Sequence, residues 1–485
     1  MGHPYPHIIE TCRTGPIAVE PFRGRTGVLG LAIVTEGKYF FIPRKEWWDE
    51  FISELFRETK GHIACFDLRR IIDFPLPDGP VYDMRAVFGG DKTLLGVMRE
   101  VHKEYVLTKR LSEVEQRIAA HVRAAKTAKV DASADLFTPK PLLEEWLKVR
   151  TMAIEHLYNT ASFSSGVPGI MMGEFEERYA FIRALHEVEL AGIHVDIDFV
   201  KTKIKEGSNP PDLKALRSIE GLYKGGFVGS LFNPMGGKTG RVRLEGGFNC
   251  MGIPKDGFAR YAITSRHENG LIYAFDYNAI DYRCIVASIG GEFAELYRGC
   301  RDFHHRTASF LFPPDEVDRV RRDTVKFISY VYIYGGSDET LSARTGLSVT
   351  AVRKVLERLD QYIGPIKKFR EGLHNLSKRQ GYITLPNGKE LYTTEADGSP
   401  MHDGKVIGLF AQTYSSVVFE AAFVRVHRLL QGTKSCIIFS VHDELVLDMH
   451  PDDITAGLPE RVREAMQEQD FVVTIKKGRS YGDVQ

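Results

Sequence analysis

The 485-residue sequence lacks several features that would place it in a special class. It has no CxxC pair, so neither a disulfide framework nor a cysteine zinc site is expected from its six cysteines. No apolar run approaches the roughly 18 residues that span a bilayer, and the N-terminus lacks the pattern of a signal peptide. These absences predict a cytoplasmic chain with reduced cysteines and no membrane partner, with an organelle as the alternative location.

An excess of charge of either sign is also missing, because 64 lysines and arginines balance 64 aspartates and glutamates. Any nucleic-acid partner must therefore bind a local basic surface. The apolar fraction of 43% and the charged fraction of 26% are typical of a soluble globular protein. The length exceeds what one hydrophobic core supports and predicts two to four domains or subdomains.

The order of apolar patterns predicts where the first domain ends. Strand-like runs and amphipathic helical stretches alternate over residues 16–131, which favours a small α/β domain. The polar passage "AAKTAKVDASADLFTPKP" then indicates a boundary. Residues 141–195 read as helical, residues 206–247 are rich in glycine and proline, and strands and helices alternate again beyond 270.

Two carboxylates stand at the ends of expected strands. Asp276 follows the apolar run of "LIYAFDYNAIDYR", and "FSVHDELVLD" reads as a tight hairpin with His442, Asp443 and Glu444 at its bend. Acids at a turn are often simply solvated. Two carboxylates at strand ends could also hold two Mg²⁺ ions, which clamp the oxygens of an in-line phosphoryl transfer. The spacing alone leaves both interpretations open.

A third pattern lies between these acids, in "RRDTVKFISYVYIYGG". Arg322, Lys326, Tyr330 and Tyr334 recur every four residues, which in a helix aligns two cations and two rings on one face. Such a face could hold a triphosphate and stack on a base. The alternative is an ordinary amphipathic helix with a basic edge. The β-branched and aromatic residues of 325–334 would even favour a strand by propensity alone.

Taken together and in order, these motifs resemble the signatures of family A DNA polymerases. "DYNAIDYR" is similar to the first signature, "RDTVKFISYVYIYGG" to the fingers helix, and "VHDEL" to the third signature. Further matches, over about residues 170–450, are "VELAGIHVD", "TGRV", "RDFHHRTA", "GYITLPNGK" and "AQTYSS".

The resemblance implies an α/β and α+β chain with an RNase H-like N-terminal domain followed by a right-hand polymerase domain. The implied boundaries are 1–135 for the exonuclease-like domain and 136–485 for the polymerase domain, with the thumb at about 170–240, the palm at about 241–310 and 405–485, and the fingers at about 311–404. The implied function is template-directed DNA synthesis, which adds deoxynucleotides to a primer 3′ end by two-metal phosphoryl transfer.

The resemblance also assigns metal ligands. Asp276 and Asp443 would bind two Mg²⁺ ions, for which Mn²⁺ can substitute, with the main-chain carbonyl of Tyr277 as a further ligand and Glu444 as a weak one. The implied partners are primer-template DNA and deoxynucleoside triphosphates, bound by a monomer. A processivity or replisome partner is a further candidate.

The nucleotide and DNA contacts follow by the same resemblance. Lys326 would act as the proton donor to pyrophosphate and would grip the triphosphate with its neighbours. The implied nucleotide-binding residues are Arg322, Lys326, Tyr330, Tyr334, Gly335, His304, Asp281 and Tyr277. The implied DNA-binding residues are Arg241, Arg260, Arg283, Gln412 and His442, the last beside the primer terminus.

Four departures from the family pattern stand out. Asp281 replaces the usual Glu that excludes ribonucleotides, and Met251 replaces a Gln that reaches the template. Ser329 and Tyr330 stand where Asn and Phe are commonest. Only about 43 residues separate "VELAGIHVD" from "TGRV", which predicts a much reduced thumb.

The N-terminal domain resembles the family's 3′–5′ exonuclease module in decayed form. The expected Asp-x-Glu pair reads Glu20 and Phe22, and the second motif keeps Asp67 but has Ile63 in place of Asn. Because two metals need several acidic ligands, this predicts an exonuclease-deficient, structural domain.

Two alternatives to a DNA polymerase remain. One is a catalytically impaired nucleic-acid-binding scaffold derived from a polymerase, although a mere binder has no use for both acids and both cations. The other is a single-subunit RNA polymerase, which shares the palm, although "VHDEL" and "DYNAIDYR" fit DNA polymerases better.

Overall fold

The fold is that of a computed structural model. It describes residues 6–13, 17–24, 27–35, 38–43, 48–59, 63–65, 81–83, 94, 106–127, 142, 145–154, 172–207, 209–234, 239–395, 399–467 and 471–484. The chain divides into two compact units, Met1–His186 and Glu187–Gln485. The boundary expected after residue 135 lies outside the described residues, and the division falls some fifty residues later.

The first unit contains a mixed five-stranded sheet in the order β3-β2-β1-β4-β5. Strands β1, β2 and β3 pair antiparallel, whereas β4 and β5 continue the sheet parallel to β1. Apolar residues of β1 and β2 are buried, as the predicted alternation of strands and helices requires. The elements are α1 (Pro6–Cys12), β1 (Ile17–Gly24), β2 (Gly27–Thr35), β3 (Lys38–Pro43), α2 (Trp48–Glu58), β4 (Ile63–Cys65), β5 (Val81–Asp83) and α5 (Val106–Thr127).

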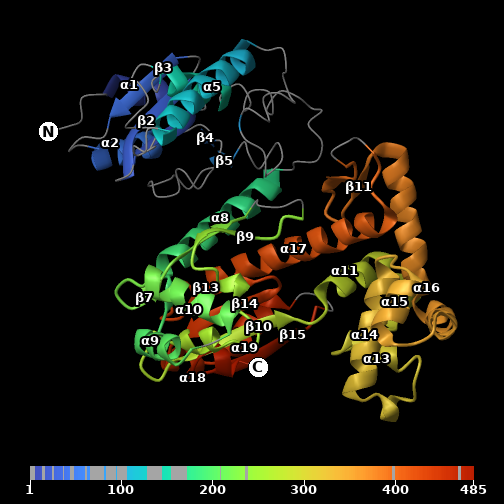
Figure 1. Ribbon diagram of the computed structural model, residues 1–485. Helices are drawn as coiled ribbons and strands as arrows, with labels where there is room; N and C mark the ends of the chain where they lie inside the picture. Colours follow the sequence, from blue (N-terminus) through green and yellow to red (C-terminus); the bar gives the residue numbers. More distant parts are fainter. Residues whose placement is uncertain are drawn as a thin grey trace. The chain divides into compact units, whose positions relative to one another are not determined.

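The second unit is built on an antiparallel four-stranded sheet in the order β13-β14-β10-β15. Its central strands are almost continuously apolar and buried, because helices cover the sheet. Helix α17 packs on α11, α19 and β13 and runs from the sheet to the hairpin region of β11 (Figure 1). The elements are β10 (Leu271–Tyr277), α11 (Ile280–Ile289), α17 (Asp403–Leu430), β13 (Cys436–Val441), β14 (Glu444–Met449), α18 (Pro451–Thr455), α19 (Leu458–Met466) and β15 (Val473–Gly478).

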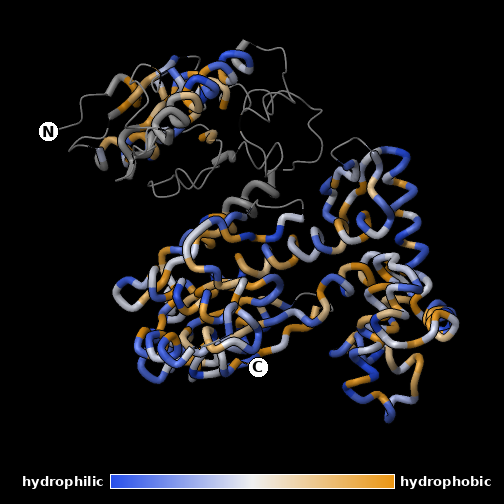
Figure 2. Tube along the Cα trace, in the orientation of Figure 1, coloured by the Kyte–Doolittle hydropathy of each residue, from blue (hydrophilic) through white to orange (hydrophobic). Residues whose placement is uncertain are grey.

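A helical lobe with its own hydrophobic core adjoins this sheet within the second unit (Figure 1). The core includes Tyr282, Tyr297 and Phe303, so the lobe also draws on residues before 311, where the fingers were expected to begin. Polar and apolar residues interleave along its helices, as amphipathic packing requires (Figure 2). The elements are α12 (Gly291–Glu295), α13 (Phe303–Ala308), α14 (Arg319–Ile333), α15 (Asp338–Thr345), α16 (Val349–Gln380), β11 (Tyr382–Thr384) and β12 (Glu390–Tyr392).

Helix α14 forms despite its strand-favouring composition. Asp318 caps its N-terminus by accepting a hydrogen bond from the backbone N–H of Arg321. Val325, Ile328 and Ile333 are buried on one face against α13 and α16. Tertiary packing therefore overrides propensity here, and the helix predicted from the four-residue spacing is confirmed.

The segment expected to form a reduced thumb contains only short elements after α8. Between Asp196 and Thr239 lie two helices of 10 and 13 residues, α9 and α10, capped by Asp196 and Asn209. Small two-stranded sheets complete this region. The elements are α8 (Met172–Ala191), β6 (Ile193–His194), α9 (Ile197–Glu206), α10 (Pro210–Leu222), β7 (Phe227–Val228), β8 (Ser230–Asn233) and β9 (Arg243–Gly247).

Among the described residues, α17 is the one helix long and apolar enough to cross a membrane by length and composition. In its most apolar stretch 61% of the residues are buried inside the protein. Its apolar residues thus pack against neighbouring helices and strands, as those of a core helix do.

Candidate active site

The predicted hairpin bend is present at the end of β13. Val441 pairs with Glu444, so His442 and Asp443 form a two-residue turn. His442 has φ 54°, the left-handed conformation that such turns require. The backbone N–H of Tyr277, at the end of β10, donates to the carbonyl oxygen of Asp443 at 3.3 Å. The end of β10 and the hairpin bend therefore meet.

Asp276 lies beside the bend because β10 pairs with β14. Its cross-strand partner is Glu444, so a second carboxylate stands opposite it. Burial, followed by the charges of Glu444 and Asp443, raises the pKa of Asp276 to about 6, although Lys476 and Lys255 oppose the shift. Like charges gathered in a partly buried place disfavour ionisation, and a cation would relieve them.

Asp443 is similarly perturbed but has one cationic partner. Arg241 Nη2 lies 2.9 Å from Asp281 Oδ1 and 3.4 Å from Asp443 Oδ1. Burial raises the pKa of Asp443 to about 6, and the charge of Asp281 adds to the shift, whereas Arg241 opposes it. Arg241, expected to line the duplex, thus bridges two acids of the site in this structure.

The donor set fits Mg²⁺. The described residues contain no group of three His, Cys, Asp or Glu side chains that could enclose a metal. Magnesium in phosphoryl-transfer sites usually needs only one or two carboxylates together with substrate phosphates and water. Asp276 and Asp443 offer two hard carboxylate oxygens, and burial, with neighbouring acids, raises the pKa of each.

The cations and rings of α14 follow one face of the helix, as predicted. The rings of Tyr330 and Tyr334 are nearly parallel, with centroids 6.1 Å apart. Burial, followed by the charges of Asp281 and Asp443, raises the pKa of Tyr330 to about 12, so this ring is electrostatically close to the acids. Lys326 is exposed.

Arg322 lies near the N-terminal end of this face, and His304 of α13 lies near it. Arg322 Nε lies 2.6 Å from Asp302 Oδ2, so a phosphate would have to compete with that carboxylate. Burial, followed by Lys326 and Arg322, lowers the pKa of His304 to about 4, which keeps its ring neutral. His304 Nδ1 is buried with no hydrogen-bond partner among the described residues. The structure therefore brings His304 close to both predicted phosphate-binding cations.

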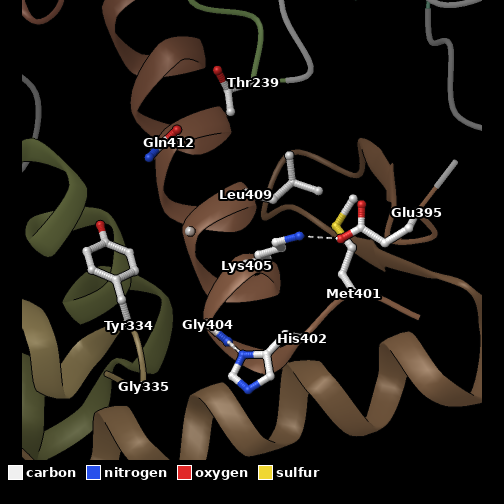
Figure 3. A pocket seen from close by; sticks show the side chains of 11 residues that line it. Thr239, Tyr334, Gly335, Glu395, Met401, His402, Gly404, Lys405, Leu409 and Gln412 are labelled. Carbon is white, nitrogen blue, oxygen red and sulfur yellow. Dashed lines mark hydrogen bonds and ion pairs between the residues drawn. The ribbon is translucent and has the colours of Figure 1, made fainter. Parts of the chain in front are cut away.

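A cavity of about 640 Å³ opens beside the C-terminal end of α14. Tyr334 and Gly335 line one side, and Gln412 and Lys405 of α17 line the other (Figure 3). Lys405 Nζ is paired with Glu395 Oε1 at 2.7 Å. Tyr334, Gly335 and Gln412, three predicted nucleotide or DNA contacts, thus share one concave surface.

Two predicted DNA contacts are placed differently from the expectation. Arg283 is 3% exposed, and its guanidinium donates to the carbonyl oxygens of Asn278 and Cys300 at 2.7 Å each. It braces the protein interior, which does not agree with a duplex contact. Arg260 stacks on the ring of Tyr481, with its guanidinium carbon 3.8 Å from the ring centroid.

The remaining predicted residues support the site. The Tyr277 hydroxyl donates to the carbonyl oxygen of Met466 at 2.5 Å, which anchors the end of β10 to α19. His442 is exposed at the bend, and Met251 lines a narrow cleft with it and Asp443. The hydroxyl of Ser329 is buried and donates to the carbonyl oxygen of Val325 at 2.7 Å.

Sequence reasoning missed two residues that hold α14 in place. Arg370 of α16 donates to the carbonyl oxygens of Tyr332 and Ile333 and thereby satisfies the C-terminal end of α14. A Cβ at Gly404 would lie 2.0 Å from the carbonyl oxygen of Tyr334, so only glycine permits this approach of α17. A basic residue within α16 and a glycine near the start of α17 carry no local signal of these roles.

Among known proteins, the chain is similar to several that are described as DNA polymerases. The chain is 25% identical over 209 residues to the thermostable DNA polymerase I of Thermus thermophilus, covering 41% of this chain and 25% of that one. It is 24% identical over 239 residues to a DNA polymerase of Mycobacterium phage D29, covering 49% and 38%. The matched part thus spans well under half the length of these relatives.

A solved structure shares the fold. It is the POL domain of Pol1 from M. smegmatis in complex with DNA primer-template and dNTP, with a TM-score of 0.77 and 17% identity, covering 100% of this chain and 99% of that one. The model of DNA polymerase family A matches residues 215–483, more than half of the chain. That segment includes β10, α14 and the β13–β14 hairpin. The chain therefore belongs to DNA polymerase family A.

Proposed function

We propose that the protein is a DNA-directed DNA polymerase that extends a primer 3′ end on a DNA template. The observation that carries the proposal is the meeting of Asp276 and Asp443 at one edge of the sheet, both with pKa values raised to about 6. The same unit contains α14 with its two cations and stacked rings. A polymerase-derived scaffold is not favoured, because binding alone gives no reason to keep two carboxylates at this electrostatic disadvantage.

Each part of the site has a role in this reaction. Asp276 and Asp443, with the Tyr277 carbonyl and Glu444 as lesser ligands, would hold two Mg²⁺ ions, which supply activation of the primer hydroxyl and neutralisation of the leaving group. Arg322 and Lys326 would bind the triphosphate, and the ammonium of Lys326 would give a proton to pyrophosphate. Arg322 must first leave Asp302, its partner at 2.6 Å.

The aromatic part of the site would position bases. Tyr330 and Tyr334 present parallel rings near the acids, and the cavity beside Tyr334 offers room for an unpaired template base. Asp281 is held by Arg241 at 2.9 Å and is shorter than the usual Glu, so we propose weaker exclusion of ribonucleotides than is typical of the family.

We further propose that the first unit does not proofread. Glu20, at the position of the first exonuclease motif, is 1% exposed and receives Arg150 Nε at 2.8 Å. Its charge is thus already balanced by a buried cation instead of being free for a metal. Ile63 is fully buried in β4, whereas Asp67 lies outside the described residues. The side chain of Phe22 is likewise not described.

Primer extension tests the proposal directly. A labelled primer on a DNA template should lengthen with deoxynucleotides and Mg²⁺, and it should not lengthen when Mg²⁺ is chelated. Parallel reactions with ribonucleotides, and with a promoter-containing duplex without primer, separate a DNA polymerase from an RNA polymerase. Duplex binding without any extension would support the scaffold instead.

The proofreading proposal needs a separate reaction. A primer with a mismatched, end-labelled 3′ terminus should stay full length with Mg²⁺ and no nucleotides. A ladder of shorter products that copurifies with the enzyme would contradict the proposal, and a preparation with Glu20→Ala would show whether such a nuclease belongs to this chain.

A further inference from the structure

The last described element of the chain contacts Glu444, the carboxylate opposite Asp276. Tyr481, in the short helix η5 (Tyr481–Asp483), donates its hydroxyl to Glu444 Oε1 at 2.7 Å. Tyr481 is 3% exposed, so the contact is not a loose surface pairing. Nothing in the catalytic roles proposed above accounts for a buried hydroxyl aimed at this carboxylate.

Several contacts fix the ring of Tyr481. The guanidinium of Arg260 lies over its face, with the central carbon 3.8 Å from the centroid, and the edge of Phe439 approaches at 5.1 Å. The backbone N–H of Tyr481 donates to the carbonyl oxygen of Ile263 at 2.9 Å. A Cβ at Gly482 would lie 2.4 Å from the ring of Tyr261, so η5 fits closely against η3 (Phe258–Ala262). The hydroxyl therefore has a defined position.

Glu444 is the carboxylate directly opposite Asp276. The two are cross-strand partners on β14 and β10, so the position of the Glu444 side chain affects the site at Asp276. A glutamate side chain has three rotatable bonds, and a hydrogen bond to one oxygen removes much of that freedom. Partners of this kind orient metal-binding carboxylates in many sites.

We propose that Tyr481 is a positioning residue of the metal site, which holds the Glu444 carboxylate beside Asp276, and that Arg260 holds Tyr481 by stacking on its ring. The inference rests on the proposed function, because it assigns a role to Glu444 near the metal ions. It also gives a functional reason for the tight packing of the C-terminal η5 helix, which lies far from α14 in sequence.

Removal of one oxygen atom tests the proposal. Tyr481→Phe keeps the ring and its stacking on Arg260 but deletes the donor. Mn²⁺ binding, measured by electron paramagnetic resonance on the full chain without DNA or nucleotide, should weaken about tenfold, the lower end of what such partners contribute. The Mg²⁺ concentration for half-maximal primer extension should rise by a similar factor. The extension rate at saturating Mg²⁺ should change less than threefold.

Tyr261→Phe is the matched control, because Tyr261 belongs to the same η3–η5 contact and forms no hydrogen bond with the acids of the described residues. It should leave Mn²⁺ affinity unchanged. In a Glu444→Ala background, adding Tyr481→Phe should cause no further loss, since the hydroxyl acts through that carboxylate. Unchanged Mn²⁺ affinity in Tyr481→Phe, or an equal loss in both backgrounds, would overturn the proposal.

Two further outcomes are informative. If Tyr481→Phe does not fold, Arg260→Gln removes only the stacking cation and should weaken Mn²⁺ binding by a smaller factor of about three; no change would overturn the role of the pair. Mn²⁺ binding that depends on Tyr481 in a protein unable to extend primers would contradict the proposed function while leaving this inference intact.

Discussion

Two carboxylates on central strands, Glu20 of β1 and Asp276 of β10, show opposite treatments of buried negative charge. Glu20 is 1% exposed and is paired with Arg150 at 2.8 Å. Asp276 forms no ion pair with any described residue, and it faces Glu444 across the strands. Lys476 and Lys255 lower its pKa through their charges but form no ion pair with it among the described residues.

The difference fits the separate roles that we propose for the two carboxylates. A buried acid that serves structure needs a cation built into the fold, because an unpaired buried charge is strongly destabilising. An acid that binds a metal is more useful when its charge is left unbalanced, because the metal then supplies the missing compensation. A carboxylate on a central strand is thus paired with a cation in the first unit and left without an ion pair among the described residues in the second.

Removal of the site acids should give the largest effect. Asp276→Ala or Asp443→Ala should reduce primer extension by about 10³-fold, the upper range for loss of a preorganised electrostatic group, while duplex binding persists. Asp452→Ala is the control, because Asp452 is exposed and pairs only with surface groups; its rate should stay within twofold. Extension by either site variant within tenfold of the parent would disprove the metal-ligand assignment.

Breaking the structural pair should affect stability and leave catalysis unchanged. Arg150→Met removes the guanidinium that lies 2.8 Å from the buried Glu20 carboxylate and should lower the free energy of unfolding by about 4 kcal/mol. Thermal unfolding followed by circular dichroism measures the loss. Adding Glu20→Leu should restore much of the lost stability, because the buried carboxylate is then gone. An Arg150→Met protein as stable as the parent would mean that the ion pair with Glu20 does not stabilise the fold.

Removing a site acid should increase stability, and the size of the increase should depend on pH. Burial and the charge of Asp281 raise the pKa of Asp443 from 3.8 to about 6, so the folded state binds the proton more tightly than the unfolded state. That contribution to stability is complete below pH 3.8 and is lost as the pH rises through 6. Metal-free Asp443→Asn should therefore be more stable than the parent by up to about 3 kcal/mol at pH 8, and the difference should vanish near pH 4.

Magnesium supplies the control for this pH effect. Added Mg²⁺ should stabilise the parent at pH 8 more than Asp443→Asn, since only the parent offers the full carboxylate. A parent that is more stable than Asp443→Asn at pH 8 without metal would show that Arg241 compensates the charge fully, contrary to the raised pKa.

The local structure of the candidate site could be predicted from the sequence. The strand before Asp276, the bend at Asp443 and the four-residue spacing of α14 depend on neighbours in the chain, and each is present. The conflict between propensity and spacing in α14 was resolved by burial of Val325 and Ile328 against other helices, which no local rule contains.

Contacts between residues far apart in the sequence could not be predicted. An arginine in a DNA polymerase motif can face DNA or protein, and only the fold shows that Arg283 turns inward and that Arg241 lies between two acids. The bond from Tyr481 to Glu444 joins residues 37 positions apart, and no spacing rule predicts it. The Arg150 partner of Glu20 lies 130 positions away. The partner of each buried acid is therefore the least predictable part.

The smallest expected effect concerns Tyr330, which lies near the acids and whose pKa burial raises to about 12, so that its hydroxyl stays a hydrogen-bond donor even at alkaline pH. A dideoxynucleotide lacks the 3′-hydroxyl that helps satisfy phosphate oxygens, and the phenolic hydroxyl can supply a hydrogen bond in its place, worth roughly 1.5 to 3 kcal/mol to a charged group. Tyr330→Phe should leave ordinary incorporation nearly unchanged and raise the preference for deoxy over dideoxy substrates at least about tenfold. Competition between the two forms of one base, in parent and variant, measures this ratio.

Tyr332→Phe, on the same helix, is the control and should leave the ratio unchanged. An unchanged ratio in Tyr330→Phe would place Tyr330 outside the nucleotide site and leave it as a ring that packs on Tyr334.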